Sequence, residues 1–174
     1  MRSDWSKVQN RWLALQVRSG WEFLSSSCLR ERGYDVFCPS YLKRRRCSDR
    51  VRIQQTALFP GYLFVRFHSS NGQLIISVPG VIRFVCSDNS PVPVHDEEIR
   101  SLVITQRAGL TCGPCPFLQR GQQVEICEGP LRGLRGRVVR TEGKQKLVVS
   151  VMLLQRSVFV EIDDYRVVPC PQSE

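Results

Sequence analysis

Two cysteines separated by Gly-Pro, Cys112 and Cys115, have the spacing of a dithiol redox centre. That chemistry needs a strand before the motif and a helix after it, because the helix N-terminus lowers the pKa of the reactive thiol. Here Pro116 follows the pair directly. A zinc site would need four ligands, and the sequence holds no second close cysteine pair. We therefore expect two incidental thiols in a kinked connection, with neither redox chemistry nor a metal.

The sequence offers little for hydrolytic catalysis. The two histidines, His68 and His95, have no nucleophile or metal-ligand partner at a useful spacing. The stretch GPLRGLRG, residues 129–136, lacks the lysine and the Ser or Thr of a phosphate-binding loop. We therefore expect no enzyme activity and no cofactor.

A run of cations is the main candidate for nucleic-acid contact. Residues 1–60 hold 12 Lys and Arg against 5 Asp and Glu, whereas residues 61–174 hold 13 against 11. Such a run is either a solvated face or a set of phosphate contacts that position a nucleic acid without reading its bases. The clustering on one expected hairpin tip favours nucleic acid, through Lys43, Arg44, Arg45, Arg46, Arg50 and Arg52.

An aromatic segment, LFPGYLFVRF at residues 58–67, is apolar on both faces if it forms one strand. It matches in part the signature of RNA-recognition modules, in which Tyr62 and Phe64 would stack on bases, but Pro60 replaces the basic residue. Alternatively, a protein partner docks on the aromatic patch, or a helix of the same chain covers it. We favour the protein partner and expect Tyr62 and Phe64 to be partly exposed.

The elements that would position these residues form two domains. Residues 8–107 predict the order β-α-β-β-β-α-β-α, an α+β sandwich with helices on one side of the sheet. Apolar residues recur at helical spacing over residues 21–32, and Gly33 gives that helix a C-terminal stop. Residues 108–119 contain two glycines and two prolines and predict a linker.

After residue 119 the pattern changes to short β-rich runs separated by turns. The five runs are QQVEIC, RGRVVR, LVVSVML, SVFVEI and YRVVP. Five short strands without a helix predict a small SH3-like barrel over residues 120–170. The expected fold class is therefore α+β, with an N-terminal α/β sandwich followed by an all-β barrel.

Specific motifs add a family resemblance to this outline. Residues 121–138, GQQVEICEGPLRGLRGRV, resemble the KOW motif of NusG-type transcription factors and of several ribosomal proteins. The segments TALFPGYLFVRF and VPGVIRFVCSDNSPVPV resemble consecutive parts of the NusG N-terminal domain, and residues 147–168 resemble the end of its KOW domain. The chain is identified as a member of the NusG family, and its basic hairpin and LLQRSV segment suggest a specialised, RfaH-like paralogue.

The resemblance implies a transcription elongation or antitermination factor that docks by an apolar patch on the clamp of RNA polymerase. It implies no covalent chemistry. DNA near the transcription bubble would meet Arg18 and the hairpin cations. The positions that match the polymerase patch are Phe59, Pro60, Tyr62 and Phe64. Phe84 would border that patch.

In the family the KOW barrel recruits further proteins, such as Rho or a small-subunit ribosomal protein. The matching loop here contains Leu153, Leu154 and Arg156. Leu154 stands where the family has a prominent aromatic residue, whereas the arginine is kept as Arg156. The resemblance therefore places a partner surface at this loop without choosing between the two partners.

The totals agree with an intracellular binding protein. The hydrophobic fraction is 42%, the N-terminus has no apolar signal-peptide core, and no apolar run approaches the roughly 18 residues of a membrane span. We expect a cytoplasmic monomer that does not bind membranes. The alternative function is an RNA-binding module with an RNA-recognition-like domain and a ribosomal-type KOW barrel.

Overall fold

A computed structural model describes residues 8–47, 50–68, 73–88, 90–117, 123–141, 144–162 and 167–169. The chain separates into two compact units, residues 1–96 and 97–174. The sequence places the helix that begins near residue 95 at the end of the first domain, but nearly all of it belongs to the second unit. Among the described residues, no helix has both the length and the apolar character that a membrane crossing requires.

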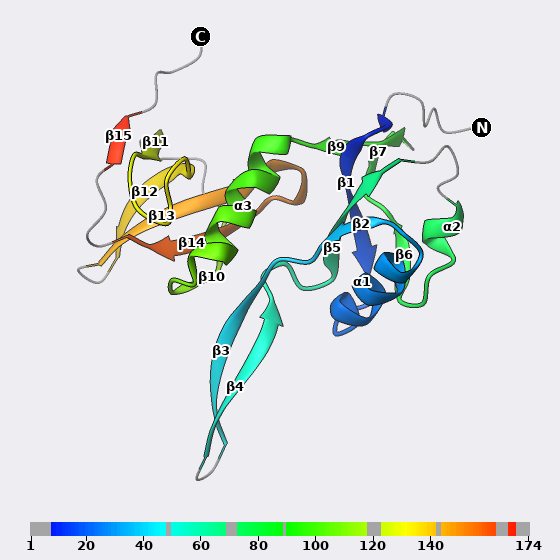
Figure 1. Cartoon of the computed structure of the whole chain (residues 1–174), viewed down its shortest axis with the longest axis horizontal. Coiled ribbons are helices and arrows are strands. Elements are labelled where there is room, and N and C mark those ends of the chain that lie inside the picture. Colours follow the sequence, from blue (N-terminus) through cyan, green and yellow to red (C-terminus); the bar gives the residue numbers. More distant parts are fainter. Residues whose placement is uncertain are drawn as a thin grey trace. The chain divides into compact units, whose positions relative to one another are not determined.

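The first unit is built on an antiparallel sheet with the strand order β2-β5-β1-β6, to which β9 adds at β1 (Figure 1). Strand β1 is central because it pairs with three other strands, and its middle residues Leu13, Ala14 and Leu15 are all buried. It pairs with β5 through the register Leu13↔Val65 and with β6 through Leu15↔Phe84. The strands are β1 (Arg11–Val17), β2 (Asp35–Phe37), β5 (Tyr62–Phe67), β6 (Val81–Phe84) and β9 (Pro93–Val94).

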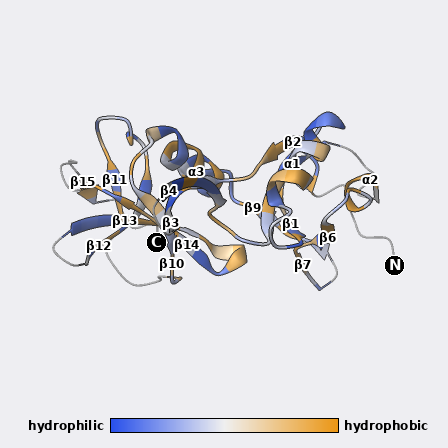
Figure 2. Cartoon of the chain, turned by 90° about the horizontal axis from the view of Figure 1, so that it is seen from below, coloured by the Kyte–Doolittle hydropathy of each residue, from blue (hydrophilic) through white to orange (hydrophobic). Residues whose placement is uncertain are grey.

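Two helices cover one face of this sheet. Helix α1 (Glu22–Glu31) ends where Gly33 adopts a positive φ of 83°, which confirms the predicted stop, and α2 (Gln73–Ile76) is a single apolar turn. Figure 2 shows the hydrophobic colouring of α2. The core beneath the helices contains Leu13, Leu15, Val17, Leu29, Leu63, Val65, Ile75 and Phe84.

Two hairpins complete the first unit. Strands β3 (Ser40–Cys47) and β4 (Arg50–Ala57) pair with each other in register from Ser40↔Ala57 to Cys47↔Arg50, and they form a separate two-stranded sheet. Residues 34–46, YDVFCPSYLKRRR, have the pattern of one long strand, but the chain leaves the main sheet at residues 38–39 and begins a new strand. A smaller hairpin joins β7 (Cys86–Ser87) to β8 (Ser90–Pro91).

The second unit contains a six-stranded sheet that includes the five strands predicted over residues 120–170, and we call this sheet the barrel. Its sheet has the order β10-β14-β13-β12-β11-β15, and every described neighbour is antiparallel. Helix α3 (Asp96–Ala108) precedes it, and its first turn is acidic, which the helix dipole favours. The remaining elements are β10 (Cys112–Cys115), β11 (Gln123–Ile126), β12 (Arg135–Thr141), β13 (Lys144–Val151), the 3-10 turn η2 (Met152–Leu154), β14 (Arg156–Glu161) and β15 (Val167–Pro169).

The segment expected to be a linker, residues 108–119, contains strand β10. Cys112 pairs with Val160 and Cys115 with Ser157, so this stretch adds a strand to the barrel sheet at β14. The sequence pattern missed it because Pro114 lacks a backbone donor. A proline is tolerated at the edge of a sheet, however, and β10 is an edge strand.

A glycine of the KOW-like motif allows β12 to approach β13 closely. A Cβ atom at Gly136 would lie 2.5 Å from the carbonyl oxygen of Val148 and 3.0 Å from Cγ of Leu147. The carbonyl belongs to a strand paired on both sides and cannot move without disturbing the ladder. At Gly113 the neighbouring atoms belong instead to the side chain of Phe159, which can rotate.

We therefore expect Gly136→Ala to destabilise the barrel by about 1–3 kcal/mol, the usual cost of overpacking. Gly113→Ala is the matched control and should cost less. The three tryptophans all precede residue 97, so tryptophan fluorescence cannot report this unit. Amide hydrogen exchange in β12 and β13 should be measured instead. Equal protection of both variants would contradict the steric argument.

Candidate binding surfaces

The segment Phe59-Pro60-Gly61-Tyr62 forms a tight turn rather than the start of a strand. The Tyr62 amide donates to the Phe59 carbonyl oxygen at 3.0 Å, and Gly61 has a φ of 82°. A proline followed by a residue with positive φ is the pattern of a type II turn. The predicted strand over residues 58–67 therefore begins at Tyr62, and the alternation of faces does not extend back through the turn.

The turn separates the predicted polymerase-binding residues into exposed and buried groups. Pro60 is exposed and Tyr62 is half-buried. Phe59 and Phe64 are 1% and 0% exposed and contact each other edge to face, with ring centroids 5.9 Å apart. The expectation that Phe64 is partly exposed is therefore wrong, and base stacking on both Tyr62 and Phe64 loses its support.

Phe84 lies on the other face of the sheet. It pairs with Leu15 across the β1–β6 ladder and is buried in the core under the helices. Side chains two positions apart share a face, so the register determines this placement. Phe84 therefore does not border the patch, contrary to the expectation.

Two polar residues that the sequence analysis did not select lie beside Tyr62. Gln16 pairs with Tyr62 on one side and with Arg83 on the other, so the three form a row across β5, β1 and β6. Arg83 Nε donates to Gln16 Oε1 at 2.8 Å. The signal in the sequence was the single polar residue in the apolar run from Trp12 to Val17.

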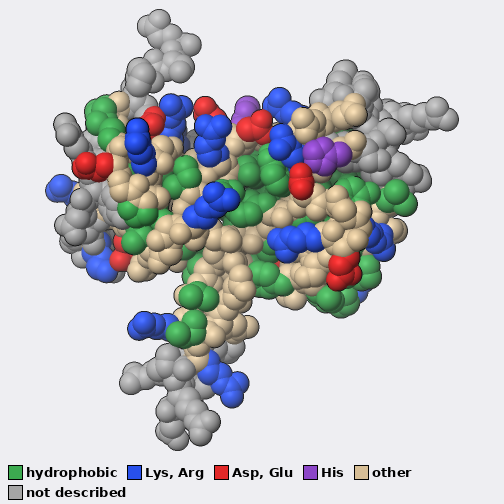
Figure 3. Space-filling view, viewed as in Figure 1, with side chains coloured by type: hydrophobic (Ala, Val, Ile, Leu, Met, Phe, Trp, Pro, Cys, Tyr) green, Lys and Arg blue, Asp and Glu red, His purple; other side chains and the backbone are tan. Residues whose placement is uncertain are grey.

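The β3–β4 hairpin carries cations together with exposed apolar side chains. Lys43, Arg44 and Arg52 are exposed, and Leu42 and Ile53 are the most exposed large hydrophobic residues described, at 71% and 62%. Figure 3 shows Lys and Arg together with hydrophobic side chains along this hairpin.

The other predicted hairpin cations, Arg45, Arg46 and Arg50, have side chains outside the described part of the chain. Arg18, expected to join them, is exposed and follows β1, and its backbone amide donates to the Gly80 carbonyl oxygen.

The predicted KOW partner residues meet at the tip of the β13–β14 hairpin. Leu153 and Leu154 lie in η2, and Arg156 begins β14 opposite Val151; all three are partly buried. Met152, which the sequence analysis did not select, is the most exposed apolar residue of the tip at 46%. Gln155 closes the loop in the left-handed region, with a φ of 50°.

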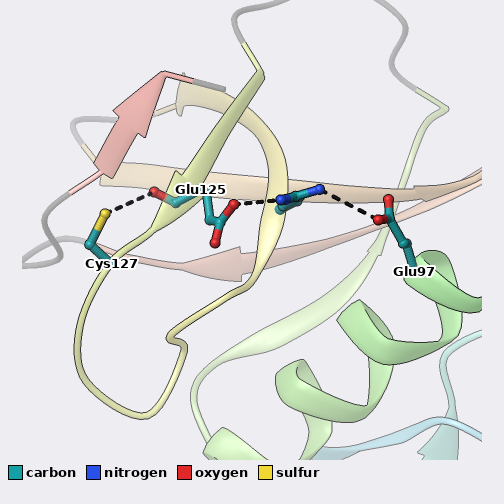
Figure 4. A network of polar contacts seen from close by, with 4 residues as sticks. Glu97, Glu125 and Cys127 are labelled. Atoms are coloured by element: carbon teal, nitrogen blue, oxygen red, sulfur yellow. Dashed lines mark hydrogen bonds and ion pairs between the residues drawn. The ribbon is translucent and has the colours of Figure 1, made fainter. Parts of the chain in front are cut away.

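Carboxylates of α3 bind groups of the barrel within the second unit. Glu98 Oε1 accepts a hydrogen bond from the Met152 amide at 3.1 Å. Arg135 lies between two carboxylates, 2.7 Å from Glu125 and 3.5 Å from Glu97 (Figure 4). These ion pairs are exposed, so each contributes at most about 1 kcal/mol.

The Cys-Gly-Pro-Cys sequence cannot form a redox centre in this fold. Residues three apart in a strand point to opposite faces, so the two thiols of β10 diverge. Burial raises the pKa of both thiols, and that of Cys115 reaches about 11 despite the opposing effect of Lys146. Within the described residues, no three or more His, Cys, Asp or Glu side chains gather as a metal site.

Comparisons with known proteins extend over most of the chain. The family model described as "Transcription termination factor nusG" matches residues 10–103. The Transcription termination/antitermination protein NusG of Escherichia coli (strain K12) is 27% identical over 169 residues, which cover 89% of this chain and 93% of that protein. The protein of the same name from Buchnera aphidicola subsp. Baizongia pistaciae is 25% identical over 173 residues, 91% and 96% of the two chains.

A solved structure also resembles this one. It is described as "Domain interaction in Thermotoga maritima NusG" and matches with a TM-score of 0.52 at 23% identity, over 87% of this chain and 92% of that chain. At this identity the match shows that the fold is shared. It agrees with the α+β class and the all-β C-terminal part predicted from the sequence.

The raised thiol pKa values predict slow alkylation of Cys115. With a pKa of about 11, about one thiol in a thousand is ionised at pH 8, and the thiolate is the reactive form. The rate with iodoacetamide should rise about tenfold per pH unit up to that value. Peptide mass spectrometry would measure the alkylation rate of Cys115, with the exposed Cys127 as the internal comparison. A Cys112–Cys115 disulfide formed in the folded protein would contradict the strand geometry.

Proposed function

The chain belongs to the NusG family of transcription termination/antitermination factors, and we propose that it acts by binding RNA polymerase through the first unit. The family match carries this proposal, because residues 10–103 include β1, the Phe59–Tyr62 turn and β5. The proposed contact surface is Pro60 and Tyr62 with the neighbouring Gln16 and Arg83. We name these four residues the turn surface.

The turn surface has the composition of a protein interface. Tyr62 offers an aromatic ring with a polar end, and Arg83 offers a guanidinium group oriented by Gln16. Tyrosine and arginine are enriched among the residues that dominate binding energies. Beneath them Phe59 and Phe64 are buried, so their role is to support the surface rather than to touch a partner.

The proposed mechanism is a population shift rather than a chemical step. A factor that binds the closed clamp of the polymerase more tightly than the open one stabilises the closed state by that difference in free energy. Such action needs neither a catalytic group nor a cofactor.

We further propose that the hairpin contacts DNA near the transcription bubble. Its exposed cations, Lys43, Arg44 and Arg52, occur on a ribbon that pairs only with itself among the described strands. Contacts of this kind go mostly to phosphates, which add affinity without selecting a sequence. The expected signature is therefore a dependence on salt.

The tip of the β13–β14 hairpin, residues 152–156, is the proposed site for a second protein partner, and we call it the barrel tip. Met152, Leu153 and Leu154 are successive apolar residues on a short loop, with Arg156 close behind them in the chain. Since the tip carries no aromatic ring, it would recognise a partner by apolar packing around the arginine. A small-subunit ribosomal protein and Rho are the two partners to compare.

Replacement of Tyr62 tests polymerase binding. Truncation of an aromatic anchor costs roughly 2 kcal/mol or more, so Tyr62→Ala should weaken binding to core polymerase by about thirtyfold. Leu24→Ala is the matched control, because Leu24 is 53% exposed on helix α1 and belongs to no proposed surface. Fluorescence anisotropy of labelled protein would give both affinities. Unchanged affinity of Tyr62→Ala would exclude the turn surface as the docking site.

The double variant Lys43→Ala, Arg44→Ala tests the DNA contact. On duplex DNA the logarithm of affinity should fall with the logarithm of salt concentration by roughly 0.9 per phosphate contact, so the variant should show a shallower slope. Arg107→Ala, Arg140→Ala removes the same charge from exposed positions of the second unit and should keep the slope. The slope is measured by titrating a transcription complex with each protein at several salt concentrations. Two equal slopes would refute the hairpin contact.

A further inference from the structure

We propose that Glu22 is a positioning residue for the turn surface, fixing the Pro60–Tyr62 turn through a hydrogen bond from the Gly61 amide to its carboxylate. This inference rests on the proposed function, because it concerns how that surface is held rather than where else a partner might bind. It depends on three observations: the amide donor that the turn leaves unpaired, the burial of the carboxylate, and the hydrogen bond that the Gly61 carbonyl oxygen accepts.

The type II turn leaves one backbone donor without a partner of its own. Its internal hydrogen bond uses the Tyr62 amide, and Pro60 has no N–H to offer. The Gly61 amide is then the donor still to be satisfied, and buried donors in proteins are almost always paired. Glu22 Oε1 accepts from it at 2.7 Å across 39 positions of sequence.

The acceptor is a buried carboxylate, which is an unusual choice. Glu22 is 4% exposed, so its carboxylate is largely withdrawn from water. Burial of a charge is unfavourable unless strong hydrogen bonds compensate for it, and a bond between a backbone N–H and a carboxylate is of the strong, charge-assisted kind. Glu22 is also the first residue of α1, where the helix dipole favours a negative charge.

The carbonyl group of Gly61 is held as well. The Val17 amide donates to the Gly61 carbonyl oxygen at 2.8 Å. Helix α1 and strand β1 therefore each hold one end of the same residue. Pro60 and Tyr62 flank Gly61 in the chain, so their positions follow from these two bonds. A surface held rigid before binding loses less conformational freedom when the partner arrives.

Glu22→Gln is the sharpest test, because glutamine keeps the size of the side chain and an acceptor oxygen but removes the charge. Since charge-assisted bonds are roughly twice as strong as neutral ones, we expect its affinity for core polymerase to fall about threefold to tenfold. Glu22→Ala should lower the affinity further. Glu31→Gln, an exposed glutamate at the other end of the same helix, is the matched control and should bind normally.

A second measurement separates positioning from general stability. Hydrogen exchange of the Gly61 amide in the full-length protein should speed up in Glu22→Gln, while amides in the centre of β1 keep their protection. All affinities are measured at a temperature where each variant is folded. Should Glu22→Ala fail to fold, the glutamine variant alone still decides the matter.

The outcomes distinguish this inference from the proposed function. If Tyr62→Ala loses affinity while Glu22→Gln keeps wild-type affinity and slow exchange of the Gly61 amide, the positioning role is overturned. The turn surface then remains the docking site. Normal binding by Tyr62→Ala would overturn the surface, and the positioning role with it. Reduced affinity in both variants, with fast exchange only at the turn in Glu22→Gln, is the expected result.

Discussion

The backbone conformation of Gly61 is the constraint on which the first unit depends. Its positive φ is open to glycine and disfavoured for other residues, and it lets the chain reverse within four residues before β5 begins. That reversal sets the pairing of Tyr62 with Gln16, and a slip of one residue would exchange the two faces of β5. The helix-covered core and the turn surface therefore both follow from the geometry of one turn.

The hairpin shows a different balance between stability and function. Its strands pair over eight residues each, yet Leu42 and Ile53 remain more than half exposed. An isolated two-stranded ribbon is marginal in water, and exposed apolar side chains add little to its stability. Folding therefore accounts for neither its cations nor its apolar residues. The proposed DNA contact accounts for the cations, which belong to the more basic part of the chain, residues 1–60.

Sequence patterns predicted the elements well where the signal was local. Gly33 marked the end of α1, and dense valine and isoleucine predicted the barrel strands. The errors came from information that the local pattern lacks. The face of Phe84 depends on its pairing with Leu15, and the strand at Cys112–Cys115 depends on an edge that only the folded barrel provides. Gln16, Arg83 and Glu22 could not be linked to Tyr62 and Gly61 before the topology was known.

The turn surface and the barrel tip share one structural device. Each presents its exposed residues next to a residue in the left-handed region, Gly61 in one case and Gln155 in the other. Glycine adopts that conformation freely, whereas for glutamine it costs about 1–2 kcal/mol. The strain at Gln155 is offset in part by two hydrogen bonds to the Met152 carbonyl oxygen, from its amide at 3.1 Å and its side chain at 2.8 Å. Strain that persists beside exposed apolar residues is typical of functional sites. The strained Gln155 therefore fixes the path of the loop beside the exposed Met152, which supports the proposed role of the tip in binding a partner.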